Sequence, residues 1–174
     1  MAITKLQSES LNLADDYTFT GTVAGAGESN VPAFMVYRSG SAQNVSNATN
    51  TKVQYNAELF DTNNCYDNTT NFRFTPTTAG KYYIFHNVGY GRDTSNVWYA
   101  GYVYIYKNGI NVAVQQISTS SNQNYWTQTV STIVDMNGTT YYVEAFVKIG
   151  VDAGITRINE DIHVNQFGGF LLTT

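Results

Sequence analysis

The fold of this chain is decided by the stretch Phe72-Arg-Phe-Thr-Pro-Thr-Thr-Ala-Gly-Lys-Tyr-Tyr-Ile-Phe85 in its middle. This stretch predicts the end of a strand, a turn around Pro76, and a strongly apolar second strand. A further apolar strand is predicted near the C-terminus, at Phe167-Gly-Gly-Phe-Leu-Leu172. We expect that last strand to pair inside a sheet, as is typical of a compact β-sandwich.

The composition of the chain also favours strands. Hydrophobic residues make up 43% of the 174 residues, enough for one well-packed domain, and charged residues make up only 13%. The 14 tyrosines and 9 phenylalanines are of types enriched in β-sheets. No segment has a helical hydrophobic period of useful length, so we predict an all-β fold.

Short alternating segments separated by turn residues recur from Ala33 onward, the pattern of a sandwich or barrel. Two Asn-Gly pairs, Asn108-Gly109 and Asn137-Gly138, predict hairpins. Residues 1–30 end in a linker of small residues, so we assign 1–30 to an N-terminal arm and 31–174 to the head. The predicted strands are 33–38, 51–56, 70–75, 80–89, 97–107, 111–117, 125–135, 140–149 and 162–172.

Several predicted strands have two faces that are both apolar or aromatic. In 101–107, Val103 and Ile105 point to one side, whereas Tyr102, Tyr104 and Tyr106 point to the other. Segments 80–88 and 141–148 alternate in the same way. A monomer would expose a large aromatic surface there. We therefore predict subunit association, with the three tyrosines at the interface between subunits.

Five segments together resemble the globular domain of the C1q family, over residues 33–174. The resemblance implies a ten-stranded jelly roll related to tumour necrosis factor (TNF), which packs as a trimer. The family favours aromatic residues where this chain has Ile84 and His86, so no functional residues are carried over. The matching segments are Val53–Asp67, Phe74-x5-Gly80-x-Tyr82, Tyr102–Gly109, Thr129–Val143 and Phe167–Leu172.

The N-terminal arm is similar to the N-termini of fibre and decoration proteins of marine tailed phages. Its first eight residues lack the apolar core of a signal peptide, and no stretch approaches a membrane span. Animal C1q-type proteins are secreted and usually follow Gly-X-Y repeats, which this sequence lacks. We therefore expect a virion protein made in a host cytoplasm, without membrane insertion. The arm would dock to the particle through Leu11, Leu13, Tyr17 and Phe19.

No constellation of residues predicts an enzyme. We interpret His86 as a buried or interface histidine and Cys65 as a small, partly buried side chain. Nucleophile motifs, phosphate loops, metal-ligand spacings and paired carboxylates are all missing, so no cofactor is expected. Asp152, Glu160 and Asp161 favour a solvated loop, with structural calcium as the alternative. The net charge of −4 and the scattered Lys and Arg residues argue against nucleic-acid binding.

Two pairs of loop aromatics are candidates for contact with a ligand or receptor. Trp98-Tyr99 and Tyr125-Trp126 each follow a polar segment rich in Asn, Ser and Gln. Rings bracketed by amides and hydroxyls are typical of saccharide sites, because sugar faces stack on rings while amides bond to hydroxyls. Each Trp also begins a predicted strand, so packing in the core or at an interface is at least as well supported.

The sequence is therefore interpreted as the trimeric, non-enzymatic head of a phage fibre or spike that binds the host surface through a glycan or protein. A capsid decoration protein without a ligand is one alternative. A secreted signalling or lectin-type ligand is another. A glycan-degrading enzyme would need two carboxylates about 5–9.5 Å apart in a cleft.

Overall fold

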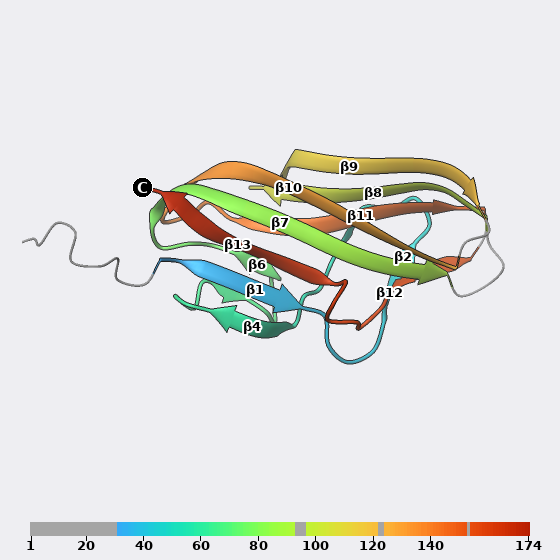
Figure 1. Ribbon diagram of the computed structural model, residues 1–174, viewed down its shortest axis with the longest axis horizontal. Helices are drawn as coiled ribbons and strands as arrows, with labels where there is room; N and C mark the ends of the chain where they lie inside the picture. The colour runs from blue at the N-terminus through green and yellow to red at the C-terminus, as the bar shows by residue number, and fades with distance from the viewer. Residues whose placement is uncertain (1–30, 93–96, 122–123, 153) are drawn as a thin grey trace, which may run out of the picture.

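A computed structural model describes residues 31–92, 97–121, 124–152 and 154–174 of the chain. These residues form thirteen strands and no helix, arranged as two antiparallel sheets (Figure 1). The number exceeds the ten implied by the resemblance, because several segments of two to four residues pair with the sheets as short strands. The predicted all-β jelly-roll class is confirmed.

The larger sheet contains seven strands, six of them in the order β2-β12-β7-β13-β1-β4, with β10 also pairing with β7. Their bounds are β1 (Ala33–Tyr37), β2 (Gln43–Ser46), β4 (Ala57–Asp61), β7 (Ala79–Arg92), β10 (Tyr125–Asn137), β12 (Ile155–Ile158) and β13 (Gln166–Thr173).

The smaller sheet contains six strands, five of them in the order β5-β6-β11-β8-β9, with β3 pairing with β11. Their bounds are β3 (Thr51–Lys52), β5 (Tyr66–Asp67), β6 (Arg73–Phe74), β8 (Trp98–Lys107), β9 (Ile110–Ser121) and β11 (Val143–Val151). Below, the outward face of a sheet is the side that points away from the other sheet.

The segment that decides the fold carries the chain from one sheet to the other. Strand β6 belongs to the smaller sheet, whereas β7 belongs to the larger one. The last strand, β13, then pairs with β7 on one side and β1 on the other, as predicted (Figure 1). Gly80 has a φ of 150°, and an added Cβ there would meet the Thr173 carbonyl oxygen at 2.4 Å. Glycine thus lets the start of β7 approach the end of β13 closely.

Aromatic rings fill the space between the two sheets at one end of the core. Phe34 stacks on Phe74 with ring centroids 4.1 Å apart and meets Phe167 edge-on at 5.3 Å. Tyr55 and Tyr66 add two more buried rings to the same cluster. The cluster joins Phe167 of the last strand to Phe34 of the larger sheet and Phe74 of the smaller sheet. Truncating one such buried ring to alanine typically costs about 3–5 kcal/mol of stability.

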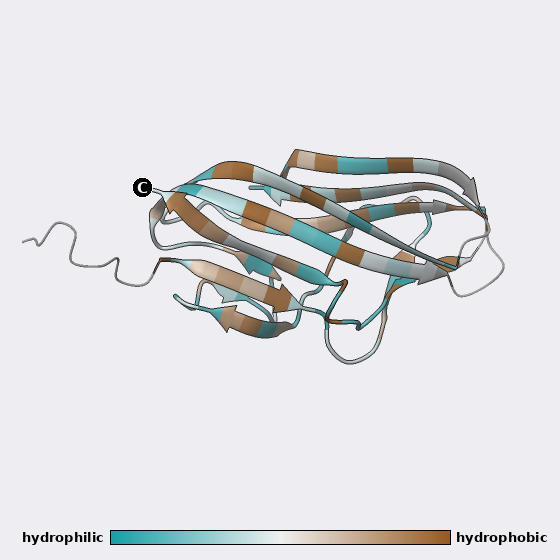
Figure 2. Ribbon diagram, in the orientation of Figure 1, coloured by the Kyte–Doolittle hydropathy of each residue, from teal (hydrophilic) through white to brown (hydrophobic). Residues whose placement is uncertain are grey.

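The predicted alternation of β8 is confirmed. Val103 and Ile105 are fully buried between the sheets, whereas Tyr102, Tyr104 and Tyr106 are half-buried on the outward face. Along β10, hydrophobic residues likewise recur between hydrophilic ones (Figure 2).

One of the two predicted hairpins is wrong. Asn108 and Gly109 join β8 to β9 with φ values of 51° and 78°, both positive as a type I′ turn requires. After Asn137, however, β10 pairs with β7 while β11 pairs with β8, so this turn crosses between the sheets. The Asn137 side chain accepts hydrogen bonds from three successive backbone amides, of which the last, Tyr141, lies at 2.9 Å.

The boundaries of other strands also differ from the prediction. Of the segment predicted at 51–56, only Thr51–Lys52 forms a strand, β3, and the next strand, β4, begins at Ala57. The last strand begins at Gln166 rather than at 162. Strands β2, β4, β5 and β12 were not predicted, since they are short and pair through backbone groups without a strong side-chain pattern.

His86 of β7 is buried in the core, as predicted. Its Nδ1 donates a hydrogen bond across the core to the Tyr104 carbonyl of β8, at 3.0 Å. Its Nε2 has no hydrogen-bond partner among the described residues, and the Tyr55 and Phe167 rings meet the imidazole edge-on. Burial lowers the pKa of His86 to about 4, although the bond to Tyr104 opposes that change.

We predict that the stability of the head falls as the pH falls from about 6.5 to about 4. Folding lowers the pKa of His86 from 6.5 to about 4. Between these two pH values the imidazole is protonated in the unfolded chain but neutral in the folded chain, so acid favours the unfolded state. The loss amounts to about 3 kcal/mol at the acid end. Chemical denaturation at several pH values measures it.

His86→Gln should remove this pH dependence of stability between pH 6.5 and 4, even if the variant itself is less stable than wild type at pH 7. The matched control is His163→Gln, because His163 is exposed. An equal slope for wild type and His86→Gln would contradict the assignment.

Candidate functional site

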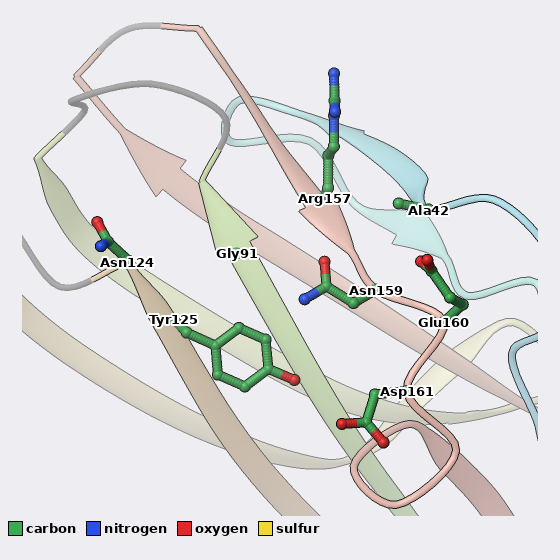
Figure 3. A pocket seen from close by; sticks show the side chains of 8 residues that line it. All are labelled: Ala42, Gly91, Asn124, Tyr125, Arg157, Asn159, Glu160 and Asp161. Carbon is green, nitrogen blue, oxygen red and sulfur yellow. The ribbon is translucent and has the colours of Figure 1, made fainter.

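An open pocket of about 530 Å³ lies at the β12 end of the larger sheet (Figure 3). Three neighbouring strands and the loop after β12 build most of it. We call it the Tyr125 pocket. Its lining residues are Ala42, Gly91, Asn124, Tyr125, Arg157, Asn159, Glu160 and Asp161.

The floor of the Tyr125 pocket is a row of cross-strand neighbours. Tyr125 of β10 and Arg157 of β12 both pair with Gly91 of β7, one from each side. An added Cβ at Gly91 would lie 3.6 Å from the Tyr125 ring and 3.8 Å from the Asn159 amide nitrogen. The missing side chain therefore keeps the floor beside the Tyr125 ring open, whereas the Arg157 side chain extends away from that ring (Figure 3).

The Tyr125 ring lies across β7 with its hydroxyl on the side of Asp161 (Figure 3). An added Cβ at Gly89 would overlap that hydroxyl, so two glycines of β7 let the ring approach the backbone. Burial, and to a smaller extent the charge of Asp161, raise the pKa of Tyr125. Its hydroxyl therefore stays protonated at neutral pH and can donate a hydrogen bond.

A buried asparagine fixes the loop that carries the acidic residues. Asn165 is fully buried; its Oδ1 accepts a hydrogen bond from the Gly89 amide at 2.8 Å, and its Nδ2 donates to the Asn159 carbonyl at 3.0 Å. Asp161 accepts a hydrogen bond from the His163 amide at 2.9 Å. The loop is thus held against β7 by bonds within the protein, which pre-organises the pocket wall.

The pocket offers two side-chain amides, a guanidinium group, two carboxylates and one aromatic ring. This set can stack a sugar ring and satisfy its hydroxyls in both donor and acceptor roles. The described residues contain no group of three or more His, Cys, Asp or Glu side chains that could hold a metal ion. Asp152, the third acid considered for calcium, directly follows β11 and accepts a hydrogen bond from the Val97 amide at 2.8 Å.

Of the four aromatic residues predicted to contact a ligand, only Tyr125 lines this pocket. Trp98 is 1% exposed and stacks on Tyr90 at 4.9 Å, which corrects its prediction as a contact residue. Its position at the start of β8 places it between the sheets. Trp126 is half-buried and packs against the core. Tyr99 is 47% exposed, on the smaller sheet.

The tyrosine ladder, Tyr102, Tyr104 and Tyr106, stands on the outward face of the smaller sheet. Tyr102 and Tyr104 are nearly parallel with centroids 6.0 Å apart, and Tyr106 contacts Phe146 at 4.5 Å. These rings contact one another within the monomer, so each of the three tyrosines is already half-buried. That they contact another subunit stays a prediction.

A second apolar surface, which sequence reasoning did not single out, lies on the outward face of the larger sheet. Tyr83 contacts Phe170 at 5.5 Å, and Ile133 pairs with Tyr83 from β10. Two features of the sequence could have indicated this surface. One is the alternation in 80–88, and the other is Phe170, which lies three residues after the buried Phe167 and therefore on the opposite face of the strand. We call this surface, formed by Met35, Phe60, Tyr83, Phe85, Ile133 and Phe170, the apolar end.

The predicted docking residues Leu11, Leu13, Tyr17 and Phe19 lie outside the described residues. Among the residues that the structure describes, no helix could cross a membrane.

No protein-family model matches this sequence, and no curated protein matches it either. Among solved structures, the chain is similar to murine APRIL in a crystal structure at pH 5.0, a jelly roll of the TNF family. The TM-score is 0.61 at 9% identity, and the match covers 82% of this chain and 99% of that chain. At this identity the likeness concerns the fold alone. The chain therefore has the TNF-like jelly-roll fold that its sequence predicted.

Proposed function

We propose that this chain is the head of a homotrimer that acts by binding rather than by catalysis. The single observation that carries the proposal is the apolar end of the larger sheet. TNF-like jelly rolls fit a trimeric, ligand-type domain, which supports the same conclusion.

The apolar end has the properties of a subunit interface. Phe60, Ile133 and Phe170 are 47%, 58% and 43% exposed, and none of the six side chains is charged. Phe85 lies over the backbone of β13, because an added Cβ at Gly168 would meet its ring at 2.6 Å. A continuous exposed apolar surface of this kind is unfavourable in a monomer and suits packing against further copies of the chain.

The tyrosine ladder makes a weaker interface candidate. Its rings are already half-buried within the monomer, and Lys148 lies over Tyr102 at 5.8 Å. Glu144 and Lys52 form an ion pair on the same face. Charged groups of this kind would lose water on association. On the larger sheet the ion pair Lys81–Asp135 lies beside the apolar end, whereas none of the six side chains of the apolar end is charged.

We predict that the double variant Ile133→Asp/Phe170→Asp dissociates the trimer. Two carboxylates per subunit, six in the trimer, would be introduced around the assembly axis, and each is costly to desolvate. Light scattering after size-exclusion chromatography measures the mass. Both positions are exposed in the monomer, so its thermal unfolding should change little.

Tyr104→Ser/Tyr106→Ser is the matched variant on the other face, and it should remain trimeric. If this variant dissociates while the aspartate variant stays trimeric, the interface lies at the ladder, as the sequence predicted. A wild-type chain that is monomeric at micromolar concentration would overturn the trimer itself.

The Tyr125 pocket is proposed to bind a saccharide of a host surface. On β10 its Tyr125 lies eight residues before Ile133 of the apolar end, roughly 26 Å away at about 3.3 Å per residue. Association through the apolar end therefore leaves the pocket open. Three copies on one head would supply avidity for a ligand that each copy binds weakly.

We predict that Tyr125→Ala weakens glycan binding about two- to tenfold per site, the range expected for the loss of one ring contact. Binding of the labelled head to an array of surface glycans measures the effect. Tyr141→Ala is the control, because Tyr141 is also 38% exposed but does not line this pocket. Equal loss in both variants, or none in Tyr125→Ala, would contradict the proposed site.

The trimer is further proposed to project from a tailed-phage particle, with residues 1–30 as the docking arm. The support is the similarity of the arm to N-termini of fibre and decoration proteins. Deleting 1–30 should abolish incorporation into particles while leaving the trimer intact, as mass spectrometry of purified particles would show. Truncated protein still present on particles would rule out the docking role. A head that neither binds cells nor blocks infection would indicate a decoration protein instead.

A further inference from the structure

A second, smaller pocket of about 230 Å³ lies on the outward face of the smaller sheet. It belongs to a different sheet from the Tyr125 pocket and shares no residue with it. We call it the Tyr99 pocket. It is lined by Ala48, Tyr99, Ala100, Tyr102, Lys148 and Gly150.

Two neighbouring cross-strand pairs shape the Tyr99 pocket. Ala100 of β8 faces Gly150 of β11, and the next outward pair is Tyr102 with Lys148. The two small residues leave a hollow beside two large ones. An added Cβ at Gly150 would lie 2.5 Å from the Tyr99 ring, so the glycine lets that ring lie against β11 and wall the hollow.

The charged side chain that lines this pocket is the cation Lys148, although the whole chain carries a net charge of −4. No acidic residue lines it, and Lys148 lies within reach of the Tyr102 ring at 5.8 Å. Among the described residues, Glu144 is the acid that pairs with β8 on this face, and it is bonded to Lys52. Asp152, just beyond Gly150, is held by the Val97 amide at 2.8 Å.

The rest of the face repeats the same combination of rings and cations. Lys52 lies over Phe146 at 5.7 Å and Arg73 over Tyr142 at 4.4 Å. Beside the pocket, the tyrosine ladder continues along β8 and carries a row of phenol groups. A chain-like ligand seated in the pocket would therefore meet more rings and hydroxyls along β8.

We propose that the Tyr99 pocket binds an acidic sugar unit of a polysaccharide. The sugar ring packs against Tyr99 and Tyr102, and its anionic group meets the Lys148 ammonium. Charge complementarity requires the anionic group, and the two rings require a ligand with an apolar ring face. The anionic group is a carboxylate or a sulfate. The proposal does not depend on the trimer or on the Tyr125 pocket, since every lining residue comes from one chain.

The test uses the full chain and three oligosaccharide probes of equal length: a polyuronate, a sulfated glycan and a neutral glucan. Titration calorimetry at low salt should show binding of the polyuronate, of the sulfated glycan, or of both, which identifies the anionic group. The neutral glucan should bind at least tenfold more weakly. Failure of both acidic probes to bind, or equal binding of the neutral one, would overturn the proposal.

Two variants test separately how the charge of Lys148 and the shape of the Tyr99 pocket contribute to binding. Lys148→Gln should weaken binding of the acidic probe about tenfold and reduce its dependence on salt. Gly150→Ala should weaken it similarly without changing charge, because the added Cβ displaces the Tyr99 ring. Lys81→Gln is the charge control, since Lys81 is exposed on the larger sheet and pairs with Asp135. Circular dichroism checks that each variant is folded.

A polyglutamate peptide of matched charge distinguishes a sugar site from general attraction of anions. Binding of polyglutamate as tightly as the acidic sugar would overturn the proposal, and so would an unchanged affinity in both Lys148→Gln and Gly150→Ala. Tyr125→Ala should bind the acidic probe like wild type. Loss there instead would place the acidic sugar in the Tyr125 pocket.

Discussion

The hydrogen bonding of β7 is the constraint on which the rest of the structure depends. Strands β10, β12 and β13 all pair with β7, so three segments distant in sequence are brought together along one strand. Its inward side chains, from Tyr82 to Tyr90, are buried in the core. Because successive side chains of a strand point to opposite faces, the inward residues fix where every outward residue lies.

The two ends of β7 consequently carry different surfaces. Near its start, Tyr83 and Phe85 meet Phe170 and Ile133 and form an apolar patch. Near its end, glycines replace the large side chains and leave a polar hollow beside Tyr125. One strand thus separates a surface suited to subunit packing from one suited to a hydrated ligand. The proposed trimer interface and the proposed saccharide site at Tyr125 both follow from this division, since burying the apolar end leaves the Tyr125 pocket accessible.

Much of the fold could be predicted from the sequence, but little of the binding surface. The strong alternation in β7, β8 and β11 gave their faces correctly, since a period of two is a local property. For Trp98 the sequence left ligand contact and core packing both open, because a ring at a strand start looks the same in sequence whether it points to solvent or core. The second Asn-Gly turn was misread because strand pairing depends on distant partners.

By itself, the sequence determined the all-β class, the buried last strand, the buried His86 and the two-faced aromatic strands. Each follows from local alternation, turn residues and the burial of apolar side chains. Only the tertiary structure decided which outward residues lie together: Gly91 between Tyr125 and Arg157, and Gly150 beneath Tyr99. These pockets form where glycines lie beside large side chains of neighbouring strands. Strand register sets those pairings, and a single sequence does not reveal it.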